Sequence, residues 1–288
     1  MIGYSHIKDG ATSWRINQKG LFPLSPPNKI VSNKIELARL MKNTNTLYMR
    51  WESNFDNLES SFWWHIICDK ILNIEELSKN TRYQVRRGKK NFYTEILSRD
   101  TILDEGFKVY KNSFARYKTH ENEFDKNQFK VAILNMSEHT EFFGARSIET
   151  RELLAFSENY IEDNICFCNS IWFDPSAFKQ KISYLFFYDL INLYLKEKEF
   201  KYISDGTRSI SHNTNIHEFL QSKFGFRKAY ASLNVIYHPL LNIFVKFFYP
   251  LRKCLEFLPF KIFKMASIFL KQEEIHRKCI NSNVMYKR

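Results

Sequence analysis

Three strand-like segments follow one another between residues 141 and 173, and this succession constrains the fold most strongly. The segments 141–148, 152–160 and 164–173 are separated by turns of only a few polar residues. Connections this short join antiparallel neighbours, because parallel strands need a crossover of a dozen or more residues. The sequence therefore predicts an antiparallel meander.

A long helix is predicted directly after the meander, from Asp174 to about Lys196. Asp174 suits the N-cap position, and Pro175 suits the first helical residue, where its missing N–H is harmless. Apolar residues at helical spacing then form one stripe that suits packing on a sheet. They are Ile182, Leu185, Phe186, Leu190 and Leu193.

The remaining elements alternate between strands and helices, which predicts an α+β fold with a mixed, mostly antiparallel sheet flanked by helices. Alternating or β-rich stretches predict further strands at 47–51, 62–68, 92–97, 201–204 and 228–237. Helical spacing predicts helices at 74–88, 103–117, 127–136 and 215–223, with Gly88 just after the end of the first.

The pattern also suggests a division of the chain. Residues 1–45 are polar and contain Pro23, Pro26 and Pro27, so we expect an irregular segment there. Residues 46–238 are expected to form the main domain, with halves at 46–136 and 137–238. After Pro239 the chain is basic and helical in pattern, which predicts an amphipathic helical extension over 239–288.

Composition excludes several classes of protein. Glycine contributes 8 of 288 residues, against a usual share of about 7%, so dinucleotide-binding, P-loop and propeller folds are disfavoured. No nucleophile elbow or Walker sequence occurs. No histidine lies at metal-ligand spacing from carboxylates or cysteines, so no metal is expected. The five cysteines show no CxxC spacing, which favours a reduced, cytoplasmic setting.

The net charge of +12 has two interpretations. A basic balance suits an anionic partner such as RNA, a phosphorylated substrate or lipid headgroups. AT-rich coding would equally produce many Lys, Asn, Ile and Phe residues. Neither a signal peptide nor a run of 18 apolar residues is visible in the sequence.

Two stretches resemble a known family. The first is the basic segment 77–90, followed by a strand, and the second is 215–228, a short helix that ends in Lys-Phe-Gly-Phe before a strand. With the order of elements, they resemble the GNAT-like acyltransferase fold over residues 60–238, and within it the FemAB-type group. That resemblance implies transfer of amino acids or other acyl groups to cell-wall or surface-glycan acceptors, with acyl-CoA or aminoacyl-tRNA as the donor.

The sequence departs from the family in two places. The turn before the long helix is glycine-rich in members that use acyl-CoA, whereas Phe173 to Ala177 contains no glycine. Lys179 and Lys181 are then the residues expected to bind the phosphates of the donor. The tyrosine that often protonates the leaving thiolate is replaced by Gln221, which cannot act as an acid. These departures favour an aminoacyl-tRNA donor or a degenerate site.

The densest polar stretch, 205–215, follows a strand and precedes a short helix, where α/β sheets often hold ligands. We expect Asp205 and His212 to be catalytic, because a carboxylate and an imidazole can take a proton from an attacking amine. Arg208, Asn213 and Asn215 are expected to bind an anionic acceptor. A loop that merely caps the helix would have the same composition.

Two basic regions are candidates for binding partners. Arg82 and Arg86 lie one turn apart on the first predicted helix and could contact the phosphates of tRNA or of a lipid-linked precursor; a solvated helix face is the alternative. Residues 239–270 combine many phenylalanines with Lys and Arg, as helices that lie on an inner membrane surface do. Those phenylalanines could equally pack over the sheet. A catalytically inactive GNAT-like module that binds RNA or an anionic membrane is therefore the alternative to an enzyme.

Overall fold

The structure is a computed structural model that describes residues 5–9, 12–17, 19–24, 26–27, 33–116, 122–210, 215–256 and 261–285. The chain forms two compact units. The first contains Ile67–Gly206 and Ile216–Arg227. The second contains Tyr4–Ile66, Thr207–Asn215 and Lys228–Arg288. The domain boundaries expected near residues 45, 136 and 238 stay predictions.

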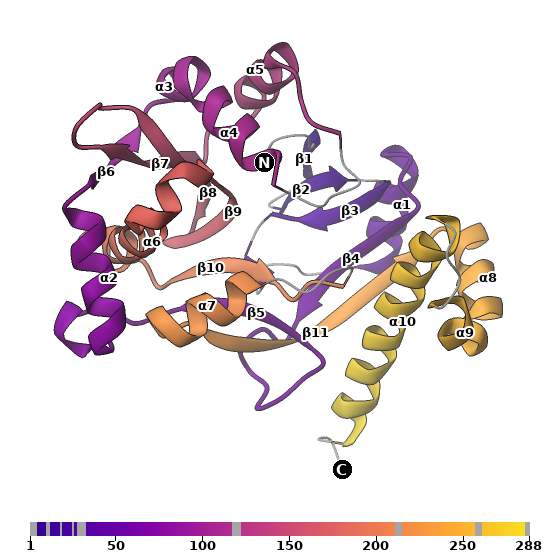
Figure 1. The fold of residues 1–288 in the computed structure, drawn as a ribbon. Helices are drawn as coiled ribbons and strands as arrows, with labels where there is room; N and C mark the ends of the chain where they lie inside the picture. Colours follow the sequence, from indigo (N-terminus) through magenta and orange to yellow (C-terminus); the bar gives the residue numbers. More distant parts are fainter. Residues whose placement is uncertain are drawn as a thin grey trace. The chain divides into compact units, whose positions relative to one another are not determined.

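The sheet of the first unit has the strand order β6-β7-β8-β9-β10 (Figure 1). Neighbouring strands from β6 to β9 are antiparallel, and β9 and β10 are parallel. The meander expected at residues 141–173 is confirmed as β7, β8 and β9. The strands are β6 (Phe92–Leu97), β7 (Thr140–Ser147), β8 (Leu153–Glu162), β9 (Ile165–Phe173) and β10 (Tyr202–Thr207).

Helices pack on both faces of this sheet. On one face the buried aromatic side chains of Tyr110 and Phe129 meet Phe142 and Phe156 of the strands. On the other face Phe186 contacts strand residues, and its ring centroid lies 5.1 Å from that of Phe143. The helices are η2 (Ile74–Glu76), α2 (Lys79–Lys89), α3 (Arg99–Thr101), η3 (Ile102–Gly106), α4 (Phe107–Phe114), α5 (Lys126–Leu134), η4 (Pro175–Gln180), α6 (Ile182–Asn192), η5 (Leu193–Glu197) and α7 (Asn215–Phe224).

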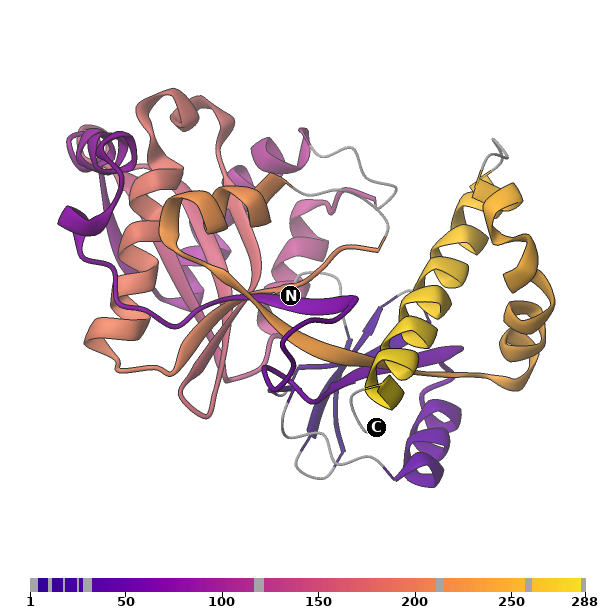
Figure 2. The same cartoon turned by 90° about the horizontal axis from the view of Figure 1, so that it is seen from below.

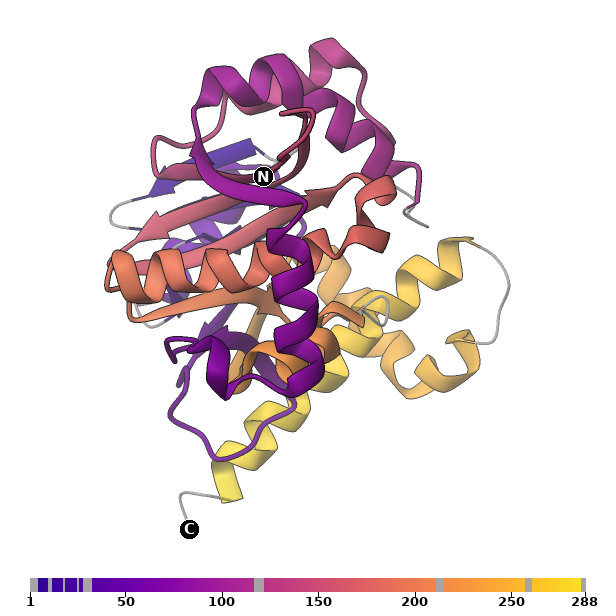
Figure 3. The ribbon, with the colours of Figure 1, turned by 60° about the vertical axis from the view of Figure 1, so that its left-hand side comes forward.

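Gly88 has a packing role that differs from the prediction. It lies inside α2 rather than after its end. A Cβ atom at this position would be 2.8 Å from Leu185 Cβ, so the absence of a side chain lets α2 approach α6 closely (Figure 3). The helix expected over 74–88 is also divided, because Ser78 caps α2 by accepting a hydrogen bond from the Thr81 N–H.

The long helix expected from Asp174 to about Lys196 is interrupted. Asp174 does cap a helix with Pro175 at its start, as predicted, but that helix is the short 3₁₀ segment η4. Lys181 then adopts a left-handed conformation with φ of 72°, and α6 begins at Ile182. Residues in this conformation are usually glycines, so a lysine at this position gives no sign of a break. The apolar periodicity does not reveal the break either.

The second unit contains the strand order β1-β2-β3-β4-β11-β5. β3 and β4 are parallel, whereas the pairs β1–β2, β2–β3 and β4–β11 are antiparallel. The elements are β1 (Ser5–Asp9), β2 (Thr12–Asn17), β3 (Gly20–Pro23), α1 (Lys34–Asn43), β4 (Tyr48–Ser53), β5 (Trp63–Cys68), β11 (Arg227–Tyr237), α8 (Pro239–Phe248), η6 (Tyr249–Leu251), α9 (Arg252–Glu256) and α10 (Lys261–Met285).

The expectation of an irregular segment at residues 1–45 was wrong. This stretch supplies three strands and a helix to the second unit. Trp14 and Leu21 of its strands are buried with Leu37 and Met41 of α1, so the segment has a hydrophobic core of its own. The polar residues between these positions lie on the outer faces and obscured the alternation.

The helical extension predicted after Pro239 is confirmed as α8, η6, α9 and α10. α10 packs on the strands of the second unit through Ile275 and Cys279, which are buried with Trp63 and Leu233. Among the described residues, no helix has the length and apolar character needed to cross a membrane. The predicted α+β class, with mostly antiparallel sheets flanked by helices, is confirmed.

Candidate active site at the ends of two parallel strands

The strands β9 and β10 part after a short stretch of pairing. Tyr202 to Ser204 of β10 pair with Ile165 to Phe167 of β9, and β9 then continues to Phe173. Because the strands are parallel, their carboxyl ends lie at the same edge of the sheet, and α6 and α7 begin from that edge. This is where ligands bind in sheets with parallel strands. Unpaired backbone groups of a parted strand can also bond to an extended ligand.

Asp205 lies on β10 directly after the last paired residue. Its side chain is only 11% exposed. Burial raises the pKa of the Asp205 carboxyl to about 7, because the ionised form has lost its hydration. The carboxyl group is thus divided between its protonated and ionised forms at neutral pH, which is the property of an efficient general base or acid.

His217 of α7 lies beside Asp205. Its Nε2 atom is 3.6 Å from Asp205 Oδ2. Burial lowers the pKa of His217, and a hydrogen bond with the Asp205 backbone raises it in part; the net direction is downward. At neutral pH the imidazole is mostly uncharged, so the contact is a close approach of two side chains and not a full ion pair.

Packing of α7 on α6 fixes the position of His217. The ring of Phe219 lies 5.1 Å from that of Tyr184 and 5.9 Å from that of Phe187. Gln221 lies one turn after His217, and its Nε2 donates to the His217 carbonyl oxygen at 3.2 Å. The amide occupying the expected tyrosine position therefore contacts the backbone of the histidine.

Sequence reasoning missed His217, although a signal was present. His217 and Gln221 are four residues apart and so share one face of α7. Attention to Gln221 as the replacement of an acid would have led to the histidine one turn earlier. What the sequence did not show is that this face meets Asp205.

The turn after β9 is closed by Asp174 and offers no anion site there. One carboxylate oxygen accepts from the Ser176 N–H and hydroxyl, at 2.9 and 2.6 Å, and the other accepts from Asn112 Nδ2 at 2.6 Å. Burial raises the pKa of Asp174, but these hydrogen bonds outweigh it, so the net pKa is lowered and the group is ionised. Its charge would repel a phosphate.

Lys179 and Lys181 lie further along, where α6 actually begins. Lys179 is exposed at the end of η4, and Lys181 is the residue before α6, without a capping hydrogen bond from its side chain. The first N–H groups of α6 therefore belong to Ile182 and Ser183, next to two lysines. The N–H groups at a helix N-terminus, together with positive charge, suit a phosphate.

The other residues expected in this stretch are distributed differently. His212 and Asn213 lie outside the described residues. Asn215 is exposed as the first residue of α7. Arg208 belongs to the second unit, where its Nη1 donates to the Phe62 carbonyl oxygen at 2.6 Å and its guanidinium lies 4.4 Å from the centre of the Trp64 ring. Of the five residues, only Asp205 is placed by the structure in the first unit with His217, and the roles of the others stay predictions.

Arg82 and Arg86 on α2 contact an acidic residue that precedes the helix. Arg82 Nη1 lies 2.5 Å and Arg86 Nη2 lies 2.9 Å from the carboxylate of Glu75. Glu75 precedes the basic segment 77–90, so the composition of that segment gave no sign of these ion pairs. Glu75 partly neutralises both charges, and phosphate binding by Arg82 and Arg86 stays a prediction.

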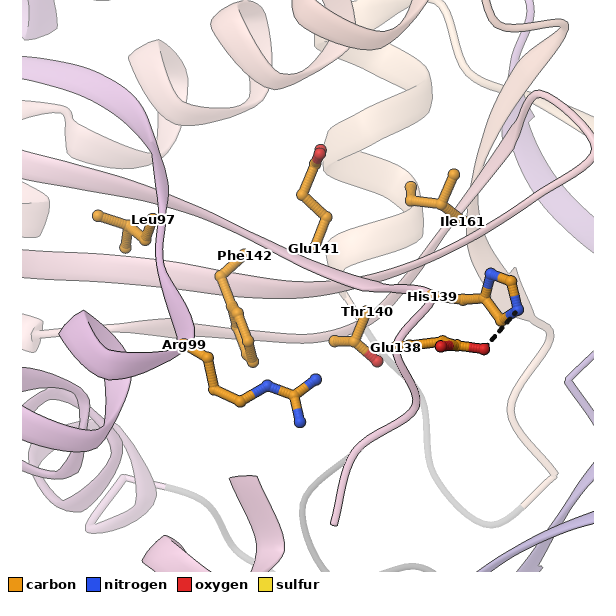
Figure 4. Close-up of a pocket in the computed structure, with 8 residues that line it drawn as sticks. All are labelled: Leu97, Arg99, Glu138, His139, Thr140, Glu141, Phe142 and Ile161. Atoms are coloured by element: carbon orange, nitrogen blue, oxygen red, sulfur yellow. Dashed lines mark ion pairs between the residues drawn. The ribbon is translucent and has the colours of Figure 1, made fainter. Parts of the chain in front are cut away.

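A pocket of about 390 Å³ opens in the first unit, but its charged groups are engaged (Figure 4). Arg99 donates to the carbonyl oxygens of Leu134, Met136 and Ser137. Glu141 points away from Phe142 in Figure 4 and accepts from Lys198 and Tyr194. Arg99 and Glu141 are thus held by other contacts, and the remaining charged groups of the pocket, Glu138 and His139, lie 4.0 Å apart at its exposed rim. Within the described part of the chain, no cluster of His, Cys, Asp or Glu could hold a metal ion.

The chain has a GNAT-like fold that is similar to that of FemX, as the resemblance in the sequence predicted. It resembles FemX with a TM-score of 0.55 at 10% identity, covering 84% of this chain and 90% of FemX. It resembles L-PGS from Bacillus licheniformis with a TM-score of 0.53 at 14% identity, covering 84% and 87% of the two chains.

A third similar structure is the C-terminal domain of a protein described as a lysylphosphatidylglycerol synthetase from Agrobacterium fabrum, with a TM-score of 0.51 at 10% identity. That match covers 81% of this chain and 84% of the other. No protein-family profile and no curated protein matches the sequence. At these identities the similarity establishes the fold.

Proposed function

We propose that the protein transfers an acyl or aminoacyl group from an activated donor to an amine or hydroxyl of a cell-envelope acceptor. The observation that carries this proposal is the Asp205 carboxyl, which titrates near neutral pH at the point where β9 and β10 part. A base with that pKa can take a proton from an amine without remaining protonated itself.

In the proposed reaction the acceptor nitrogen or oxygen attacks the carbonyl carbon of the donor. The new C–N or C–O bond forms as the bond to the leaving sulfur or oxygen breaks. Asp205 takes the proton of the nucleophile, and the leaving thiol or hydroxyl finally receives a proton. His217 lies against the Asp205 side chain and helps to position it, while backbone groups of β9 beyond Phe167 can bond to the acyl portion.

The donor is proposed to carry a phosphate that binds at the start of α6. Lys179, Lys181 and the N–H groups of Ile182 and Ser183 supply positive charge there. Both coenzyme A and the 3′ end of a tRNA carry such a phosphate. The absence of an acid at Gln221 favours the tRNA ester over the thioester in the family comparison.

Calorimetric titration at low salt separates these donors. Coenzyme A, acetyl-CoA, and charged and uncharged tRNA are titrated into the wild-type protein and into Lys179→Glu/Lys181→Glu. Exposed lysines of α5 give a matched control, Lys126→Glu/Lys130→Glu. Binding of one donor that weakens about tenfold or more only in the first variant would support the phosphate site. Equal weakening in both variants would reduce the effect to overall charge.

Transfer itself is measured with a labelled acyl group and a panel of acceptors. The solved structures with this fold include FemX and a lysylphosphatidylglycerol synthetase, so peptidoglycan precursors and phosphatidylglycerol are the first acceptors to test. Label should appear in one acceptor and be absent when Asp205 is changed to Asn. Label that transfers equally well with the variant would contradict the proposed role of Asp205.

A second candidate function is a GNAT-like module that binds RNA or an anionic membrane without catalysis. Gln221 in the position of the expected acid and the closed turn at Asp174 favour it. This alternative predicts tight binding of tRNA whether or not it is charged, together with no labelled product from any donor.

A further inference from the structure

α8 in the second unit has two apolar faces. Leu241, Phe244 and Phe248 pack with the buried Val245 against Leu270 of α10, and α8 and α10 lie side by side in Figure 2. This packing covers the apolar face of α8 that points to the rest of the unit. The adjacent face of α8 stays exposed, because at 3.6 residues per turn its side chains point about a quarter turn away from the packed face.

The outer face of α8 carries an exposed line of large apolar residues. Leu240 is 73% exposed, Ile243 is 65% exposed and Phe247 is 70% exposed. Their spacing of three and four residues places them on one side of the helix, and Leu251 of η6 continues the line. We call these four residues the α8 stripe. Single exposed apolar residues are common, but a helical row of this kind marks a contact surface.

Positive charge accompanies the α8 stripe. Lys246 and Lys253 are exposed, and no ion pair involves them among the described residues. Arg252 next to them is paired with Glu274, with Nε 3.4 Å from Oε2. The sequence from residue 239 to residue 255 contains no Asp or Glu. A partner of this surface must therefore be apolar in its interior and negative at its edge.

We propose that the α8 stripe docks this protein on the surface of an anionic phospholipid bilayer. The helix would lie along the surface with the stripe among the acyl chains near the headgroups, and the two lysines would contact lipid phosphates. A second copy of the chain fits less well, because a symmetric contact through this face would bring Lys246 of both copies together. The inference concerns binding alone and does not depend on the proposed transferase activity.

The test is flotation of the full-length protein with vesicles that contain phosphatidylglycerol and phosphatidylcholine, compared with vesicles of phosphatidylcholine alone. Wild-type protein is expected to float with the anionic vesicles and to dissociate as salt is raised, since surface charges are screened within about 10 Å at 0.1 M salt. The variant Ile243→Ser/Phe247→Ser should lose about tenfold or more in apparent affinity. Lys246→Glu/Lys253→Glu should lose binding mainly to anionic vesicles.

α5 of the first unit supplies matched controls. Val131 and Leu134 are an exposed apolar pair three residues apart, at 56% and 50%, and Lys130 lies beside them. Val131→Ser/Leu134→Ser and Lys130→Glu should float like wild type. The proposal is overturned if the α8 variants float as well as wild type, or if the α5 variants lose as much binding as they do.

Light scattering tests whether a second copy of the chain, and not a membrane, covers the α8 stripe. If wild-type protein forms a dimer that Ile243→Ser/Phe247→Ser dissociates, and neither protein binds vesicles, the stripe is an interface between copies and the membrane proposal fails. Circular dichroism spectra that match wild type show that a variant has kept its fold, so loss of flotation then reports the surface itself.

Discussion

Each unit contains a histidine beside a buried carboxyl group, and the two pairs behave in opposite ways. His217 Nε2 is 3.6 Å from Asp205 in the first unit, and His65 Nε2 is 3.7 Å from Glu52 in the second. The separations and the burial are similar. Yet the pKa of Asp205 is raised to about 7, whereas that of Glu52 is lowered.

The difference lies in the groups around each carboxyl. Burial raises the pKa of Glu52 as well, but His65, the positive charge of Arg50 and a hydrogen bond from Trp63 Nε1 at 3.1 Å outweigh it. Asp205 has burial as its only resolved cause. A carboxyl that is surrounded by donors is a structural anion, and one that is merely desolvated remains available for proton transfer.

The largest effect expected from this contrast is on catalysis. Asp205→Asn keeps the shape of the side chain and removes the base, so the rate of transfer should fall about 10²- to 10⁴-fold. The wild-type kcat/KM should rise with pH through an apparent pKa near 7, as Asp205 ionises. Initial rates between pH 5 and 9 measure both. A flat pH profile, or a variant with the wild-type rate, would show that Asp205 is structural like Glu52.

The next effect is on stability and concerns the other pair. Glu52→Gln replaces the ionised acceptor of the Trp63 Nε1 hydrogen bond by a neutral amide, which should cost about 1.5–3 kcal/mol of the free energy of unfolding. Asp205→Asn should not destabilise the protein at pH 7, because it removes a carboxyl whose ionisation is disfavoured by burial. Urea titrations of both variants give the comparison. Similar losses of unfolding free energy in the two variants would contradict the proposed difference between the Glu52 and Asp205 sites.

The pH dependence of stability should have opposite signs at the two sites. Asp205 has a native pKa of about 7 against an ordinary value of 3.8, so the folded state binds more protons between those values. Its contribution therefore favours folding at low pH and declines as pH rises through 7. Glu52 has a lowered pKa, so its contribution is present above its ordinary value and is lost as pH falls below it.

Thermal melts of wild type and Asp205→Asn at pH 5 and pH 8 isolate the Asp205 contribution. Asparagine resembles the protonated carboxyl, so the variant should exceed the melting temperature of wild type slightly at pH 5, where the unfolded carboxyl is already ionised, and by much more at pH 8. The rise in the pKa of Asp205 from 3.8 to about 7 corresponds to a stability difference of at most about 4 kcal/mol between wild type and variant. A difference between the two proteins that is constant over this pH range would argue against the raised pKa.

The smallest effect is expected at an exposed carboxylate. Glu75 pairs with Arg82 and Arg86 but is 58% exposed, so Glu75→Gln should change the unfolding free energy by about 1 kcal/mol or less. The same variant frees two guanidinium groups and should strengthen tRNA binding if α2 touches phosphates. A filter-binding series against salt concentration measures this, and an unchanged affinity would leave α2 as a solvated face.

Local patterns predicted the central elements of the fold well. The three segments of the meander were placed within one or two residues of β7, β8 and β9, because alternation and polar turns both mark them. The break before α6 was not predictable, since a lysine at Lys181 carries no sign of a left-handed conformation. The N-terminal strands were missed because they are only four to six residues long and prolines in and after β3 suggested a loop.

The candidate site could be predicted only in part. Asp205 was found from its position between a strand and a helix. His217 was not, because its proximity to Asp205 depends on how α7 packs against Tyr184 and Phe187. The pairing of Arg82 and Arg86 with Glu75 was missed for a similar reason: the acid precedes the helix and folds back onto it.

The pairing of β4 with β11 has a consequence for how this protein folds during its synthesis. Ser53 of β4 lies opposite Ser232 of β11, about 180 residues later in the chain. At a synthesis rate of about 5–20 residues per second, β11 is completed roughly 10–40 s after β4. During that interval one edge of β4 is open to other strands, so nascent chains that share a polysome should need a chaperone.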